Sequence, residues 1–167
     1  MLAENLTQAK TLWQIRESIP LAQAQEGLNI KHDISVPVSA IAAFVKCTDA
    51  LLHQAIAGVR LVNFGHLGDG NLHYNVQAPP GVDAGAFLRD HEQQVNRIVF
   101  DSVLAHQGSI SAEHGIGSLK VDHLAHYKSA VALGLMRSIK QALDPLNLMN
   151  PGRVLVCPAH PSCQPVS

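Results

Sequence analysis

A segment with a central Asp-Gly pair, GHLGDGNLHYN at residues 65–75, constrains the fold of this chain more than any other. The apolar-rich run at residues 59–64 and the alternating run at residues 72–77 both have the pattern of a β-strand. Asp69-Gly70 favours a two-residue type I′ turn, in which both central residues have positive φ. The sequence therefore predicts a β-hairpin centred on these two residues.

This hairpin predicts a pair of facing histidines. With Asp69-Gly70 at the centre of the turn, His66 lies directly opposite His73. Directly opposed residues have Cβ atoms about 4.5–5.5 Å apart on one face, so the two imidazoles could bind one divalent cation. Asn75 points to the same face as His73. Because the chain contains 10 His, the alternative is that these are ordinary packing or surface residues.

A second segment, GSISAEHGIG at residues 108–117, places an acid beside an imidazole between glycines. One interpretation is a solvated Glu-His pair where a helix meets a loop. The other makes Glu113 the third metal ligand and leaves His114 free as an acid or base. Two His and one Glu with an open position form a common catalytic metal site, whose ion acts as a Lewis acid on a substrate oxygen. This donor set suits zinc, manganese or iron, and we expect zinc or manganese.

Length and composition indicate a folded protein of one domain. The chain has 167 residues, 47% hydrophobic and 15% charged, enough for a sizeable core. Its net charge of -1 gives no indication of a nucleic-acid or anionic-membrane partner. No apolar run reaches the roughly 18–20 residues of a membrane span, and no secretory signal is visible. We therefore expect a cytoplasmic protein.

The three cysteines predict neither a disulfide framework nor a structural zinc site, because their number is odd and no CxxC pair occurs. Two of them, Cys157 and Cys163, flank His160 in a proline-rich end. That end could bind a metal weakly. We expect instead a flexible tail over residues 156–167, because its prolines oppose regular structure.

The rest of the chain alternates between helical and extended patterns. Helices are predicted at residues 1–26 (with Pro20 near the far end), 40–55, 84–106 and 131–143, and a further strand at 31–38. The order strand, helix, hairpin, helix, loop, helix predicts an α+β fold. In it, an antiparallel sheet carries helices packed on one face.

Three segments, residues 65–75, 108–117 and 136–155 (MRSIKQALDPLNLMNPGRVL), together resemble the C-terminal domain of FAD-linked oxidases. The similarity is to the D-2-hydroxy-acid dehydrogenase branch, which includes D-2-hydroxyglutarate dehydrogenase, D-lactate dehydrogenase and the glycolate oxidase flavoprotein subunit. The resemblance implies a ferredoxin-like substrate domain over residues 1–155. Complete members also carry a large FAD-binding domain, which we do not expect in this sequence. Because the sequence starts within the substrate domain, we also expect an incomplete copy of that domain.

The same resemblance implies how a substrate carboxylate is held. Arg16, in the motif WQIRE, and Lys31 match the arginine and lysine that bind it in the family, and a guanidinium fork suits a carboxylate. The alternative is a solvated Arg-Glu pair beside a core tryptophan. The threonine that D-2-hydroxyglutarate dehydrogenases carry soon after the arginine is Pro20 here, a departure that leaves the substrate side chain open.

The remaining roles also follow from the resemblance. The metal on His66, His73 and Glu113 would bind the 2-hydroxyl of a D-2-hydroxy acid, and Asn75 would orient it. His114 would take the hydroxyl proton as hydride passes to FAD. The family also implies a position near the flavin for Asn150; the alternative is a simple turn after a helix.

Three functions follow from these interpretations. The first is the substrate- and metal-binding domain of a flavin dehydrogenase, inactive alone and partnered by an FAD-binding domain or subunit. The second is a non-catalytic metal- or ligand-binding module. A metal hydrolase is disfavoured because no nucleophile motif is present. Unpaired edge strands and an uncovered apolar face should favour a homo-oligomer.

Overall fold

The computed structural model describes residues 2–156 and contains a three-stranded antiparallel sheet in the order β1-β3-β2. The strands are β1 (Asn29–Ser35), β2 (Arg60–His66) and β3 (Asn71–Gln77). Helix α2 (Ile41–Ala55), preceded by a 3₁₀ turn (Val38–Ala40), connects β1 to β2, and α3 (Ala84–Ala105) follows β3. The predicted α+β fold with an antiparallel sheet is confirmed.

The succession β1-α2-β2-β3-α3 is that of a ferredoxin-like fold up to its last strand. After α3 the chain returns to the free edge of β1. There Ser109 forms an isolated antiparallel bridge with Ser35, and the backbone N–H of Ala112 donates to the carbonyl of Asp33. A short irregular segment therefore stands where a fourth strand would lie.

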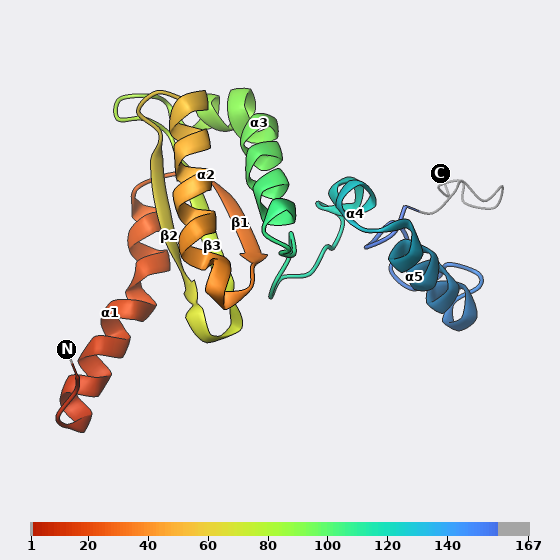
Figure 1. Cartoon of the computed structure of the whole chain (residues 1–167), viewed down its shortest axis with the longest axis horizontal. Helices are drawn as coiled ribbons and strands as arrows, with labels where there is room; N and C mark the ends of the chain where they lie inside the picture. The colour runs from red at the N-terminus through yellow and green to blue at the C-terminus, as the bar shows by residue number, and fades with distance from the viewer. Residues whose placement is uncertain (1, 157–167) are drawn as a thin grey trace.

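One face of the sheet carries the hydrophobic core. Alternate residues of β1 and β3 point to this face, where His32 is paired with Tyr74 and Ile34 with Leu72. Helices α2 and α3 cover it (Figure 1). The helical contribution to the core comes from Phe44, Leu52, Phe87, Val95, Val99, Phe100 and Val103. This packing leaves the opposite face of the sheet for polar side chains.

A buried histidine lies within this core. His32 is 1% exposed, its Nδ1 lies 2.8 Å from the carbonyl of Tyr74, and its Nε2 lies 2.8 Å from the Asn96 side chain. Burial outweighs these hydrogen bonds and lowers the pKa of His32 from 6.5 to about 4. The ring is therefore neutral at pH 7.

Because its folded pKa is depressed, His32 should make the protein less stable in acid. Above pH 6.5 the ring is neutral in both states; below it the unfolded chain takes up the proton first, so stability falls until about pH 4. The expected loss is about 3 kcal/mol. Urea unfolding from pH 7 downward measures it, and His32→Gln should remove that part of the pH dependence. An unchanged dependence in His32→Gln would contradict this assignment.

Helix α1 (Leu6–Gln25) contacts the other face of the sheet. It begins at Asn5, whose side chain accepts a hydrogen bond from the N–H of Gln8, and it continues through Pro20. Near its end, the buried Gln23 accepts a hydrogen bond of 2.7 Å from the Asn75 amide. The N-terminal half extends past the sheet (Figure 1), so Trp13 is exposed rather than part of a core. Only part of this face is therefore covered.

The C-terminal helices form a second, smaller unit beside the sheet (Figure 1). They are α4 (Val121–Tyr127), which the sequence did not predict, and α5 (Ala130–Leu143). A small cluster of Leu124, Leu133 and Leu155 holds them together. No helix in residues 2–156 is long and apolar enough to cross a membrane. Apart from Val156, the tail predicted over residues 156–167 lies outside the described part of the chain.

Candidate functional site

The hairpin register differs from the predicted one. His66 is paired with Asn71, and His73 is paired with Phe64, so the prediction that the two histidines lie directly opposite each other is wrong. The register has moved by two residues, and side chains alternate faces with a period of two. Both histidines therefore keep a common face, diagonally rather than directly opposed, with ring centroids 6.1 Å apart.

The physical reason lies in the connection between the strands. Leu67–Asp69 forms a 3₁₀ turn, and only Gly70 adopts a left-handed conformation, at φ 71°. The carbonyl of Gly70 accepts a hydrogen bond from the N–H of Val36 at 3.0 Å. The loop is thus longer than the predicted type I′ turn and is fixed by a contact with the chain after β1.

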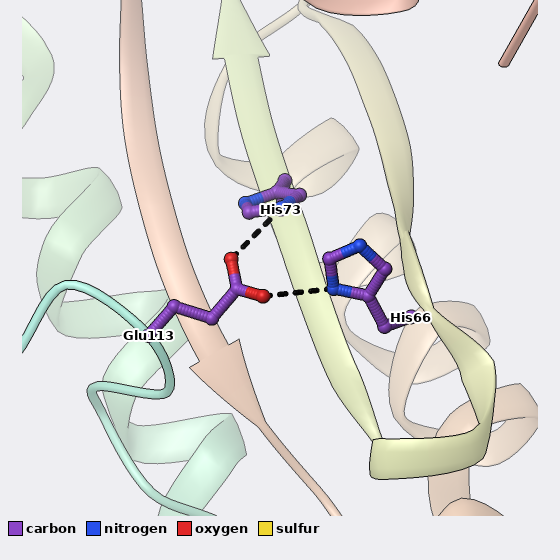
Figure 2. Close-up of side chains that lie close together, drawn as sticks. All are labelled: His66, His73 and Glu113. Atoms are coloured by element: carbon purple, nitrogen blue, oxygen red, sulfur yellow. Dashed lines mark ion pairs between the residues drawn. The ribbon is translucent and has the colours of Figure 1, made fainter. Parts of the chain in front are cut away.

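Three potential metal ligands converge on this face (Figure 2). One ligand atom from each of His66, His73 and Glu113 lies within 4.8 Å of the others. The Nδ1 of His66 is 2.8 Å from Glu113 Oε1, and the Nε2 of His73 is 3.7 Å from Glu113 Oε2. Two imidazole nitrogens and a carboxylate suit a divalent ion such as zinc, with positions left for other ligands.

His73 is the most enclosed of the three, with its side chain 18% exposed. Burial lowers its pKa below the ordinary 6.5, an effect only partly opposed by the carboxylates of Asp33 and Glu113. The ring is therefore neutral at pH 7, which is the form that binds a metal. The residues present fit the metal that the sequence predicted.

Asp33 on β1 fixes the loop that carries Glu113 and His114, and sequence reasoning missed it. Its carboxylate accepts hydrogen bonds of 2.8 Å from the backbone N–H of each of these residues. Burial raises the pKa of Asp33, but these N–H groups and the Asn71 amide outweigh burial and leave the pKa below 3.8. The only sequence signal was an acidic residue within a strand.

A cleft of about 630 Å³ lies beside His73, whereas His66 and Glu113 are not among the residues that line it. Four of the predicted site residues line it: Lys31, His73, Asn75 and His114. Pro20 also lines it, so the position at which the chain departs from the family pattern faces the same space. The amide of Asn75 is buried and bonded to Gln23, whereas the side chain of His114 is 72% exposed. The geometry therefore brings together a candidate metal ligand, a cation and an exposed imidazole.

Arg16 is close to the hairpin but is not among the residues that line the cleft. Its Nη2 donates to the carbonyl of Gly65 at 3.2 Å, and its guanidinium lies 5.5 Å from the centroid of the Phe64 ring. Since Phe64 faces His73 across the strands, Arg16 lies near the metal ligands. Only part of its hydrogen-bonding capacity is used by the Gly65 carbonyl.

Asn150 lies in the loop after α5, and it also is absent from the lining of the cleft. It has a left-handed backbone, φ 49°, and its carbonyl accepts a hydrogen bond from the N–H of Arg153. This is the geometry of a turn. The turn places Arg153 in the wall of the cleft.

Two further cations line the cleft without having been predicted as site residues: Lys120 and Arg153. The ammonium of Lys120 donates to the carbonyl of Ile110 at 3.0 Å. Burial lowers the pKa of Lys120, partly opposed by attraction to Asp33. Together with Lys31 these residues give the cleft three positive side chains against the one carboxylate of Asp33, an excess that favours an anionic ligand. No motif around Lys120 or Arg153 indicates this arrangement.

A family model described as "FAD linked oxidases, C-terminal domain" matches residues 1–154. Because the match covers most of the chain, this protein belongs to that family.

Its curated relatives include proteins named D-2-hydroxyglutarate dehydrogenase. The protein from Xanthomonas citri pv. viticola is 42% identical over 92% of this chain and 32% of the relative. The protein from Stutzerimonas stutzeri is 37% identical over 92% of this chain and 33% of the relative. A mitochondrial D-2-hydroxyglutarate dehydrogenase of Arabidopsis thaliana is 37% identical over 93% of this chain and 26% of the relative. The chain thus spans about a third or less of the length of these relatives.

Proposed function

We propose that this chain is the substrate- and metal-binding part of a flavin-dependent dehydrogenase that oxidises a D-2-hydroxy acid to a 2-oxo acid. The observation that carries the proposal is the convergence of His66, His73 and Glu113 beside a cleft lined by cations. The relatives support it, because their names specify a D-2-hydroxy acid as substrate.

The substrate carboxylate would bind Lys31, which lines the cleft, with Arg16 contributing from the hairpin side. Asn75 would orient the 2-hydroxyl, and His114 would accept its proton as hydride leaves the α-carbon. A divalent cation would supply Lewis-acid polarisation of that hydroxyl, and FAD would supply the hydride acceptor. We assign Asn150, in the loop after α5, a position near the flavin.

The end of the substrate farthest from the hydroxyl would contact the Pro20 side of the cleft. Proline lacks both a backbone N–H and a side-chain donor, so it cannot donate a hydrogen bond to this end. Substrate identity within the class of D-2-hydroxy acids would therefore depend on the other groups there. D-2-hydroxyglutarate is the first acid to test because of the relatives' names.

The proposed partner is an FAD-binding domain or subunit, since the relatives are about three times as long as this chain. Exposed apolar side chains recur every fourth residue along α5: Val131, Leu135, Ile139 and Leu143. Strand β2 forms an edge of the described sheet. Surfaces of both kinds favour association, so a homo-oligomer of the isolated chain is also part of the proposal. A cytoplasmic location stays a prediction.

A non-catalytic metal- or ligand-binding module is the second candidate. It is favoured by one observation: all three metal ligands come from this chain, so the site needs no second domain to assemble. The two candidates differ only in whether the bound acid is oxidised.

Joining this chain to the remaining two thirds of the Xanthomonas relative tests the proposal. We expect the joined protein, loaded with FAD and manganese or zinc, to reduce a dye with a D-2-hydroxy acid but not with its L enantiomer. The isolated chain should not. Lys31→Met should raise KM about tenfold or more, because a charged hydrogen bond is lost. The control is Arg97→Met, an exposed cation on α3.

Turnover by the isolated chain would contradict the requirement for a flavin-binding partner. A joined protein that binds FAD and metal yet oxidises no D-2-hydroxy acid would support the binding module instead.

A further inference from the structure

Asp33 occupies an unusual position for a carboxylate. It lies on the cleft face of β1, directly opposite His73 of β3, and its side chain is only 5% exposed. Burying a charged carboxylate is costly unless it is fully hydrogen-bonded or paired. The partners of Asp33 therefore indicate what it is used for.

Both oxygens of Asp33 are engaged by the two segments that build the metal site. Oδ2 accepts from the backbone N–H groups of Glu113 and His114 at 2.8 Å each, and more weakly from Ala112 at 3.3 Å. Oδ1 accepts from the amide of Asn71 at 2.9 Å. One carboxylate thus holds the loop that carries Glu113 against the hairpin that carries the two histidines.

The same carboxylate also faces two imidazoles. The Nδ1 of His73 lies 3.8 Å from Oδ1, and the Nδ1 of His114 lies 3.8 Å from Oδ2. Because the Nε2 of His73 faces Glu113, an N–H on Nδ1 would point toward Asp33 and leave Nε2 free for a metal. A carboxylate behind a ligating histidine commonly fixes tautomer and ring orientation in this way.

We propose that Asp33 is the positioning residue of the metal site, aligning Glu113 through its backbone and His73 through its Nδ1 side. This inference rests on the proposed function, because it requires that His66, His73 and Glu113 bind a metal. Asp33 lines the cleft but is not one of the three residues that converge as candidate metal ligands. Its effect is to hold ligands from the loop and the hairpin in one geometry.

Metal titration of the purified chain with Mn²⁺ or Zn²⁺ alone tests this role. Asp33→Asn keeps the side-chain shape but replaces one acceptor oxygen with an amide. We expect metal affinity to fall about 10–100-fold in the folded variant. The matched control is Asp49→Asn, which alters a carboxylate on α2 that accepts from the Tyr74 hydroxyl at the other face of the sheet. This control should lower thermal stability but leave metal affinity within about twofold of the parent.

A second readout needs no metal. Nitrogen-15 NMR of the His73 ring in the parent chain should show the proton on Nδ1, and Asp33→Asn should shift the population toward Nε2–H. The Nε2–H form in the parent would overturn the proposal even if Asp33→Asn failed to fold.

Unchanged metal affinity in a folded Asp33→Asn would overturn the positioning role and leave the proposed function intact, because the parent would still bind metal. A folded parent that bound neither ion would overturn both.

Discussion

Replacing His73 by alanine is expected to abolish metal binding by this chain. His73 is the most enclosed ligand, and its Nε2 faces Glu113 while its Nδ1 faces Asp33. The two ligands left in His73→Ala are both about half exposed, and two exposed ligands rarely hold a zinc or manganese ion. Mass spectrometry after equilibration with either ion should give about one equivalent in the parent, as one site requires, and almost none in the variant.

The control is His53→Ala, which removes an exposed histidine of α2. This variant should keep the metal content of the parent. Metal should also raise the melting temperature of the parent and of His53→Ala but not of His73→Ala, because an ion that binds only the folded state stabilises it. Full metal content in His73→Ala would contradict the assigned ligands and direct attention to Cys157, His160 and Cys163, which lie outside the described residues.

Local sequence signals were sufficient for the longer elements. Helix α3 was predicted at residues 84–106 and is found at Ala84–Ala105, because its apolar period is clear and Asp83 caps its first turn. Helix α5 begins one residue earlier than predicted, after Ser129. The seven-residue α4 was missed, since so short a helix offers too few periodic positions to recognise.

The hairpin register required information that the hairpin itself does not contain. Asp-Gly favours a two-residue turn, but the hydrogen bond between Gly70 and Val36 fixes a longer loop, and Val36 is far away in sequence. The predicted ligands of the hairpin and of the loop that carries Glu113 still converge. The reason is that the two-residue shift keeps His66 and His73 on one face.

Other parts of the site could not be predicted from sequence patterns. Asp33 and Lys120 acquire their positions only when β1, the loop after α3 and the start of α4 come together. Neither residue stands in a motif with a characteristic spacing. For Arg16, the resemblance predicted contact with the substrate carboxylate. Its guanidinium contacts the Gly65 carbonyl and Phe64 beside the candidate ligands, and the role in substrate binding stays a prediction.

Substitution of Gly70 by alanine should be among the most destabilising single changes in the hairpin. A Cβ at this position would lie 2.1 Å from the carbonyl oxygen of Val36, and the backbone there has φ +71°. The left-handed conformation and the overlap each cost about 1–3 kcal/mol. We therefore expect the free energy of unfolding, measured in urea, to fall by about 2–6 kcal/mol.

Substitutions at Gly68 and Asp69 distinguish the observed loop from the type I′ turn that the sequence favoured. A Cβ at Gly68 would meet nothing within 4 Å, so Gly68→Ala should change the free energy of unfolding by no more than about 0.5 kcal/mol. Asp69 lies in the 3₁₀ turn and has no positive φ, so Asp69→Ala should be equally mild. In a type I′ turn Asp69 would need positive φ, and alanine there would be costly. A large loss of stability in Asp69→Ala would therefore restore the two-residue turn and, with it, the direct opposition of His66 and His73.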